Sequence, residues 1–125
     1  MNLDMYRQNI LDHSRHPHNF GTLDGEAEHA QAVNPLCGDE VEMFLRFGAD
    51  NRVEEAKFSG RGCAITVAAA SLLTDALHGL TRSEVVALRQ EDAVALLQVP
   101  IMPARMKCAT LSLEALRKIT KENTH

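Results

Sequence analysis

The chain has 125 residues, of which 45% are hydrophobic and 24% are charged, and its formal net charge is −4. This composition is typical of one globular domain, which we expect to span residues 1–125, and it excludes a disordered or collagen-like chain. A net negative charge and scarce aromatic residues, with one Tyr and no Trp, argue against nucleic-acid binding. No segment approaches the roughly 20 apolar residues of a membrane span, so we expect a cytoplasmic protein without membrane contact.

The first half of the chain is predicted to form one helix and a small antiparallel sheet. Apolar residues recur at helical spacing over residues 4–15, which predicts the helix. A short strand is expected over 26–33, and residues 39–47 alternate between apolar and polar side chains, which predicts the clearest strand. Turn residues separate it from a partner strand at 52–59, with a bulge near 54–55 because the apolar alternation changes phase there.

The second half of the chain is predicted to be helical. Residues 63–78 are apolar on nearly every side, which predicts a buried helix. Thr81 and Glu84 form a capping-box pattern before the next helix, a short helix is expected at 92–98, and Pro103 is expected to open the last one. This order predicts an α+β fold, in which a small antiparallel sheet of about three strands packs against several helices in two layers.

Three cysteines, Cys37, Cys63 and Cys108, lie at the edges of the predicted elements. An odd number of cysteines cannot form a closed disulfide framework, and their number alone is compatible with buried small hydrophobic side chains. Their positions are more informative. Cys37 precedes the clearest strand, Cys63 opens the buried helix and Cys108 lies in the first turns of the last helix. These positions favour a site that is assembled by folding.

Asp39 gives a second indication of a site. It lies two residues after Cys37, so in extended geometry both side chains point to the core face. A buried carboxylate needs a partner, and three kinds are open: a backbone cap, the guanidinium of Arg61 or Arg105, or a metal ion held jointly with the thiolates. Gly38 lies between the two residues and lets another backbone or a ligand approach closely.

The neighbours of the cysteines favour ionised thiols. Cys63 is expected at a helix N-terminus, and Arg105 and Lys107 flank Cys108, which are surroundings that lower the pKa of a thiol. A divalent metal bound by three thiolates and one carboxylate leaves a charge of about −2. Arg105 and Lys107 would offset that charge, so the charges are consistent with a metal site.

Other polar residues are interpreted as structural. Thr66, Ser71 and Thr74 on the buried helix are expected to donate to carbonyls of their own helix. His16 and His18 flank a proline after the first helix, a grouping that suggests metal ligation. The favoured interpretation is that these histidines are solvated loop residues.

Four runs of sequence, read together, resemble one family. The runs YRQNILDHSRHPHNFG, NPLCGDE, KFSGRGCAITVAAASLL and PARMKCATLSLEALRK are similar to those of the IscU/NifU-like iron–sulfur cluster assembly scaffolds, and closest to their SufU-type branch. The resemblance implies an IscU/SufU-like fold and a transient [2Fe-2S] cluster or Zn²⁺ at one site. It also implies a cysteine desulfurase and recipient apo-proteins as partners, and it leaves a homodimer open. The implied ligands are Cys37, Asp39, Cys63 and Cys108.

Two departures from the family keep two functions open. Lys107 stands where the IscU branch has a histidine, and the 45-position separation of Cys63 and Cys108 lacks the insertion of the SufU branch. The leading hypothesis is a cluster scaffold, the second is a zinc-dependent sulfur relay, and the third is a structural zinc module. Cys37 is expected to accept sulfur first because its loop, flanked by Pro and Gly, can swing outward, and Cys108 is the alternative acceptor.

Overall fold

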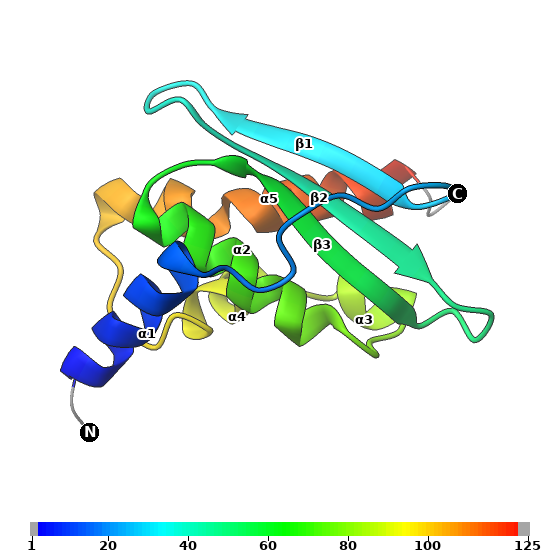
Figure 1. Ribbon diagram of the computed structural model, residues 1–125, viewed down its shortest axis with the longest axis horizontal. Helices are drawn as coiled ribbons and strands as arrows, with labels where there is room; N and C mark the ends of the chain where they lie inside the picture. Colours follow the sequence, from blue (N-terminus) through cyan, green and yellow to red (C-terminus); the bar gives the residue numbers. More distant parts are fainter. Residues whose placement is uncertain (1–2, 123–125) are drawn as a thin grey trace.

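The computed structural model describes residues 3–122, with side chains for residues 7–120. It has the predicted α+β fold, a three-stranded antiparallel sheet with helices packed on it (Figure 1). No helix within residues 3–122 is long and apolar enough to cross a membrane. The elements in chain order are α1 (Leu3–Arg15), β1 (Glu28–Asn34), β2 (Asp39–Phe47), β3 (Val53–Arg61), α2 (Ala64–Leu77), α3 (Arg82–Val86), α4 (Gln90–Ala95), the 3-10 turn η1 (Pro103–Arg105) and α5 (Met106–Glu122).

The sheet has the strand order β1-β2-β3. Asn34, the last residue of β1, pairs with Asp39, the first residue of β2. Glu40 pairs with Arg61, the last residue of β3. The predicted bulge is confirmed: Arg46 pairs with Glu55 while its neighbour pairs with Val53, so one residue of β3 is left over. The β1–β2 turn and the end of β3 therefore lie at the same end of the sheet, opposite the bulge.

The predicted helix boundaries are mostly confirmed. α1 matches the predicted helix, and the capping box of Thr81 and Glu84 is formed at the start of α3. The short helix expected at 92–98 begins two residues earlier, at Gln90, and ends at Ala95. Pro103 opens a 3-10 turn rather than the α-helix itself, which begins at Met106.

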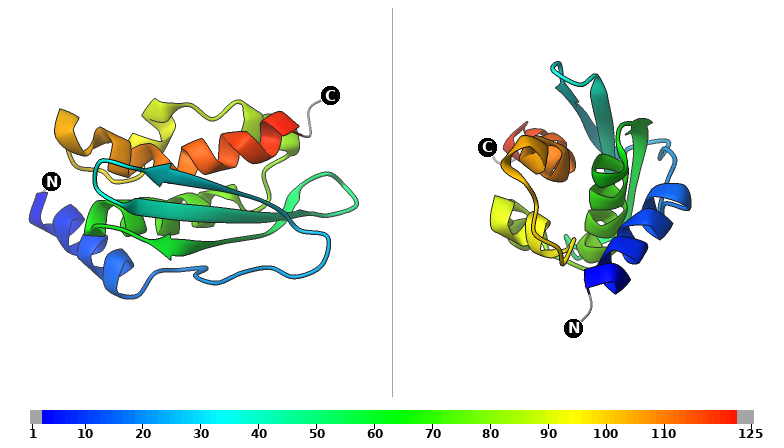
Figure 2. Two further views of the ribbon diagram at one scale, coloured as in Figure 1. Left: turned by 90° about the horizontal axis from the view of Figure 1, so that it is seen from above. Right: turned by 90° about the vertical axis from the view of Figure 1, so that its left-hand side faces the viewer.

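One face of the sheet is covered by α2 and α5, and α1 packs beside α2 on the side away from α5 (Figure 2). The core between sheet and helices includes Met43, Phe58 and Leu73, all at most 2% exposed. A second cluster joins Ile10 of α1 to Ala68 and other small residues of α2. Because α2 is packed against neighbours on several sides, its sequence is apolar nearly all round.

Two of the three hydroxyls on α2 do not donate to their own helix, contrary to the prediction. Thr74 does so, to the carbonyl of Ser71 at 2.8 Å. The Ser71 hydroxyl instead contacts Nδ1 of His13 at 2.7 Å and accepts from the backbone N–H of His18 at 2.8 Å. Thr66 donates to Asp39. These hydroxyls therefore anchor neighbouring segments to α2, because each lies where another element packs closely on the helix.

Candidate metal centre

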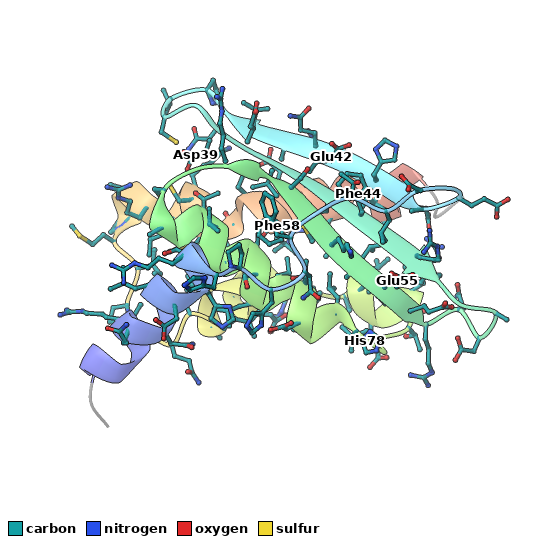
Figure 3. All side chains as sticks on the ribbon, viewed as in Figure 1. Asp39, Glu42, Phe44, Glu55, Phe58 and His78 are labelled. Carbon is teal, nitrogen blue, oxygen red and sulfur yellow. The ribbon has the colours of Figure 1, made fainter. Side chains whose placement is uncertain are left out.

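The four predicted ligands come from four places that meet at one end of the sheet. Cys37 lies in the turn between β1 and β2, Asp39 is the first residue of β2, Cys63 is the N-cap of α2, and Cys108 lies in the first turn of α5. Figure 3 places Asp39 at the end of the sheet near the beginnings of α2 and α5, far from His78 at the other end. The fold therefore brings the four candidate residues to one end of the sheet.

The donor atoms of three of these residues are close neighbours. One ligand atom each of Cys37, Asp39 and Cys108 lie within 4.8 Å of one another. Cys63 is joined to them through Thr66, whose hydroxyl lies 3.5 Å from Sγ of Cys63 and donates to Oδ2 of Asp39 at 2.5 Å. The Cys63 thiol is also within hydrogen-bonding reach of Cys108. Three thiols and one carboxylate thus form one continuous cluster.

The predicted geometry of Cys37 is wrong, although its proximity to Asp39 is confirmed. Residues 35–38 form a turn, in which the N–H groups of Cys37 and Gly38 donate to the carbonyl of Asn34 at 3.3 and 2.9 Å. Gly38 has φ +76° and a Cβ added there would meet nothing within 4 Å. Its role is therefore the left-handed turn conformation, and the turn is what brings the Cys37 thiol to Asp39.

Of the partners left open for Asp39, a backbone cap is present, since the backbone of Cys63 donates to the carboxylate, but Arg61 is not a partner. Arg61 pairs with Glu40, at 3.5 Å, and the hydroxyl that reaches the buried carboxylate belongs to Thr66. The signal for this contact was available, because Thr66 follows Cys63 by one helical turn and so faces the same end of α2. Gly62 makes the contact sterically feasible: a Cβ there would lie 2.8 Å from Cβ of Thr66 and 2.9 Å from Cγ of Asp39.

Hydrogen bonds hold the pKa values of Asp39 and Cys63 below their ordinary values despite burial. Burial by itself raises the pKa of Asp39, but hydrogen bonds from Thr66, from the Cys37 and Cys108 thiols and from the backbone of Cys63 outweigh it and leave the pKa below its ordinary value. Burial also opposes ionisation of Cys63. The Thr66 hydroxyl and the backbone N–H groups at the start of α2 lower the pKa of Cys63 overall.

Cys108 departs from the expectation of a low thiol pKa. Burial raises its pKa to about 11, and the neighbouring Cys63 and Asp39 add to this effect. Arg105 does contact the Cys108 thiol, which raises the pKa of the guanidinium, but this contact does not overcome burial. Lys107, the second predicted basic neighbour, forms an ion pair with Glu114 at 3.8 Å, so its charge is directed to the surface of α5.

The cluster is buried on one side and open on the other. Asp39 and Cys108 are 6% and 4% exposed, whereas Cys63 is half-buried and Cys37 is exposed. Beside Cys37, the side chain of Leu36 is 96% exposed. Three soft thiolate ligands with one oxygen ligand suit Zn²⁺ or iron–sulfur chemistry. A metal ion or a sulfur donor can reach the cluster from the side of the exposed Cys37 thiol.

This small α+β domain has three thiols and one carboxylate together at one end of its sheet. Such a group of side chains is typical of proteins that bind soft metals or carry sulfur. Comparison with known proteins agrees with this class. The chain belongs to the family of the NifU-like N terminal domain, which it matches over residues 5–123. This is the family of iron–sulfur cluster assembly scaffolds and SufU-type sulfur-relay proteins.

Relatives of both kinds are similar to the chain. It is 39% identical to the zinc-dependent sulfurtransferase SufU of Bacillus subtilis, over 97% of this chain and 94% of that protein. It is 35% identical to the iron–sulfur cluster assembly scaffold protein IscU of Streptococcus pyogenes, over 97% of this chain and 86% of that protein. The crystal structure of an N-terminal NifU-like protein from Brucella abortus shares the fold, with a TM-score of 0.77 at 20% identity over 98% of this chain and 97% of that one.

Proposed function

We propose that this protein is a scaffold for iron–sulfur cluster assembly. In this proposal the single domain over residues 1–125 works in the cytoplasm, receives sulfur from a cysteine desulfurase and passes a transient [2Fe-2S] cluster to apo-proteins. The observation that carries the proposal is the convergence of three thiols and one buried carboxylate at a solvent-open end of the sheet. Both the family and its scaffold members support this assignment.

The donor set suits a cargo that must leave again. Cys37, Cys63 and Cys108 are soft ligands that favour iron–sulfur clusters, whereas the Asp39 carboxylate is a hard and weaker ligand for such a cluster. Cys37 is exposed and lies in a turn rather than in the sheet. We therefore assign Cys37 and Asp39 to the side on which the cluster enters and leaves.

Sulfur entry is assigned to Cys37. Its thiolate would attack the outer sulfur of a desulfurase persulfide, which forms a new S–S bond while the old one breaks and the desulfurase thiolate leaves. This transfer is electron-neutral. Reduction of the bound sulfur to sulfide then takes two electrons from a thiol reductant. Cys108 is less suitable as first acceptor because burial raises its pKa to about 11.

A zinc-dependent sulfur relay is the second candidate function, and the 39% identity to a zinc-dependent sulfurtransferase supports it. The same four residues fit zinc, which takes thiolate and carboxylate ligands in a four-coordinate site. Bound there, Zn²⁺ would keep the thiols ionised at neutral pH. Cys37 would remain the acceptor in this case, and Arg105 would stay next to Cys108.

Anaerobic reconstitution distinguishes these functions. The metal-free protein is incubated with iron, cysteine, a desulfurase and a thiol reductant, and then analysed by visible spectroscopy, metal analysis and mass spectrometry. A labile brown cluster that moves to an apo-ferredoxin supports the scaffold. Persulfide transfer that needs zinc and builds no cluster supports the relay, and bound zinc with neither activity leaves a structural zinc module.

Variants locate the acceptor in the same assay. Cys37→Ser is expected to lose persulfide loading. Thr22→Ser, at an exposed position in the loop before β1, is the control and is expected to load normally. Loading of the Cys37→Ser variant at the level of the unchanged protein would remove Cys37 from this role and leave Cys108 as the acceptor.

A further inference from the structure

A second group of metal-ligating side chains lies where α1 and the loop after it pack against α2. One ligand atom each of His13, His18 and Asp75 lie within 4.8 Å of one another. His13 is on the last turn of α1, His18 is in the loop that follows it, and Asp75 is on the last turns of α2. Cys63 and Asp75 are twelve positions apart on one helix, which corresponds to about 18 Å. The group is therefore separate from the cysteine cluster.

We propose that His13, His18 and Asp75 form a second metal site, which takes one divalent cation of the class that includes Zn²⁺, Co²⁺ and Ni²⁺. Two imidazoles and one carboxylate are ligands that suit these borderline cations. Three protein ligands leave a fourth position for water, as in open zinc sites. The ligands come from two helices and a loop, so a bound cation would tie α1 and the loop after it to α2.

The side chains need only small shifts to accept a cation. Nδ1 of His18 and Oδ2 of Asp75 lie 2.7 Å apart in an ion pair, and two ligand atoms at about 2.0 Å from a tetrahedral ion are about 3.3 Å apart. His18 and Asp75 have side chains that are 56% and 45% exposed, so they can move by this amount without disturbing the core. The rings of His13 and His18 are already neighbours, with centroids 4.4 Å apart.

The surroundings hold the three ligands in place. Ser71 contacts Nδ1 of His13 at 2.7 Å, and Asn19 donates to the other carboxylate oxygen of Asp75 at 2.8 Å. Partners of this kind orient metal ligands in known sites. Burial and the nearby His18 lower the pKa of His13, against the opposing effect of Asp75 and Asp12. A neutral imidazole is the form that binds a metal.

Metal stoichiometry tests the proposal directly. Equilibrium dialysis of the full chain against Zn²⁺ is expected to give two equivalents, and His18→Gln and Asp75→Asn are each expected to lose one of them. His29→Gln is the matched control, because His29 forms a similar exposed ion pair with Glu42 at 2.9 Å but has no third ligand in the described part of the chain. It is expected to retain both equivalents. Binding by His18→Gln and Asp75→Asn at the level of the unchanged protein overturns the proposal.

The absorption spectrum of bound cobalt(II) distinguishes the two proposed sites in the unchanged protein, so no cysteine variant is needed. Cobalt bound by thiolates produces a sulfur-to-metal charge-transfer band in the near ultraviolet, whereas cobalt bound by imidazole and carboxylate does not. One equivalent is therefore expected to bind without adding to this band, and this equivalent is expected to be lost in His18→Gln. If all bound cobalt adds to the thiolate band, the second site does not exist, while the cysteine centre stands. If the thiolate band is absent but the other equivalent remains, the cysteine centre fails and the second site stands.

Circular dichroism melts of the metal-free variants complete the test. Because His18 and Asp75 are exposed, we expect both variants to fold, and the melting temperature of the unchanged protein to rise on addition of Zn²⁺ by more than that of either variant. An equal rise in all of them contradicts the proposal.

Discussion

At the scale of single residues, Asp39 shows how this protein keeps a carboxylate ionised in a buried place. The carboxylate is 6% exposed, yet the hydrogen bonds around it lower its pKa. A short hydrogen bond of 2.5 Å comes from the Thr66 hydroxyl. The Thr66 hydroxyl also contacts Sγ of Cys63, so one side chain orients two of the four proposed ligands.

We expect the Thr66→Val substitution to lower the free energy of unfolding of the metal-free protein by about 1–3 kcal/mol, because it leaves a buried carboxylate without its principal donor. The pKa of Asp39 should rise toward its ordinary value, which NMR titration measures. Thr120→Val is the control, since Thr120 is also buried but donates to carbonyls of its own helix. Equal losses of stability and an unchanged pKa would show that the Thr66 contact is unimportant.

The three thiols of the metal-free protein should differ in reactivity. Cys37 is exposed and Cys63 is half-buried with a lowered pKa, whereas Cys108 is buried with a pKa raised to about 11. At pH 8 a thiol of that pKa is ionised in only about one molecule in a thousand. Iodoacetamide labelling followed by peptide mass mapping should therefore modify Cys108 last, and the difference should narrow as the pH rises toward 11. Early modification of Cys108 would contradict this order.

At the scale of elements, the beginning of α2 is the part of the fold on which the site depends most. It supplies Cys63 as the N-cap, Thr66 one turn later and the backbone N–H groups that lower the pKa of Cys63. The helix can approach β2 this closely because Gly62 has no side chain. The residues between the end of β3 and the first turn of α2 therefore determine whether Cys63 can lie close to Asp39.

We expect the Gly62→Ala substitution to destabilise the protein by about 1–3 kcal/mol, the usual cost of overpacking, and to weaken metal binding at the cysteine centre. The added Cβ would lie 2.8 Å from Cβ of Thr66, an atom fixed close to the backbone of α2. Gly48→Ala is the control, because there the nearest atom is the flexible carboxylate end of Glu54, at 3.0 Å. Denaturant unfolding and zinc titration of both variants provide the comparison, and equal behaviour would refute the packing argument.

At the scale of the whole molecule, α1 is held to the rest of the fold by apolar and polar contacts together. Ile10 packs against small residues of α2, and His13 reaches the Ser71 hydroxyl on the same helix. His13 is only 8% exposed, whereas His16 and His18, which are predicted to be solvated loop residues, are exposed. The protonation of His13 is thus coupled to the packing of α1 on α2.

Stability of the metal-free protein is expected to fall as the pH drops below about 6.5. Burial lowers the pKa of folded His13, so the unfolded chain binds more protons between the two pKa values, and stability is lost as the pH falls through this range. Urea unfolding between pH 7.5 and 5.5 with a chelator measures the effect. His13→Asn should show a shallower pH dependence, with His16→Asn as the exposed control. The same slope in all three proteins would exclude His13 as the cause.

The sequence by itself determined most of the local structure of this protein and indicated the candidate site residues. The alternation of residues 39–47 predicted β2, and the capping pattern of Thr81 and Glu84 predicted the start of α3, because both signals depend on residues a few positions apart. The positions of Cys37, Cys63 and Cys108 at element edges indicated an assembled site. The two-residue spacing from Cys37 and the resemblance of the motifs to a family indicated Asp39 as the fourth candidate.

Only the tertiary structure decided how those residues act on one another. The packing of β2 against α2 makes Thr66, rather than Arg61, the partner of Asp39. The packing around α5 buries Cys108 and raises its pKa in spite of Arg105. The packing of α1 on α2 brings His13 and His18 beside Asp75. Desolvation and hydrogen bonding act over a few ångströms between segments that are far apart in the chain. Local periodicity carries no information on such encounters, which is why the partners and ionisation of the site could not be predicted from it.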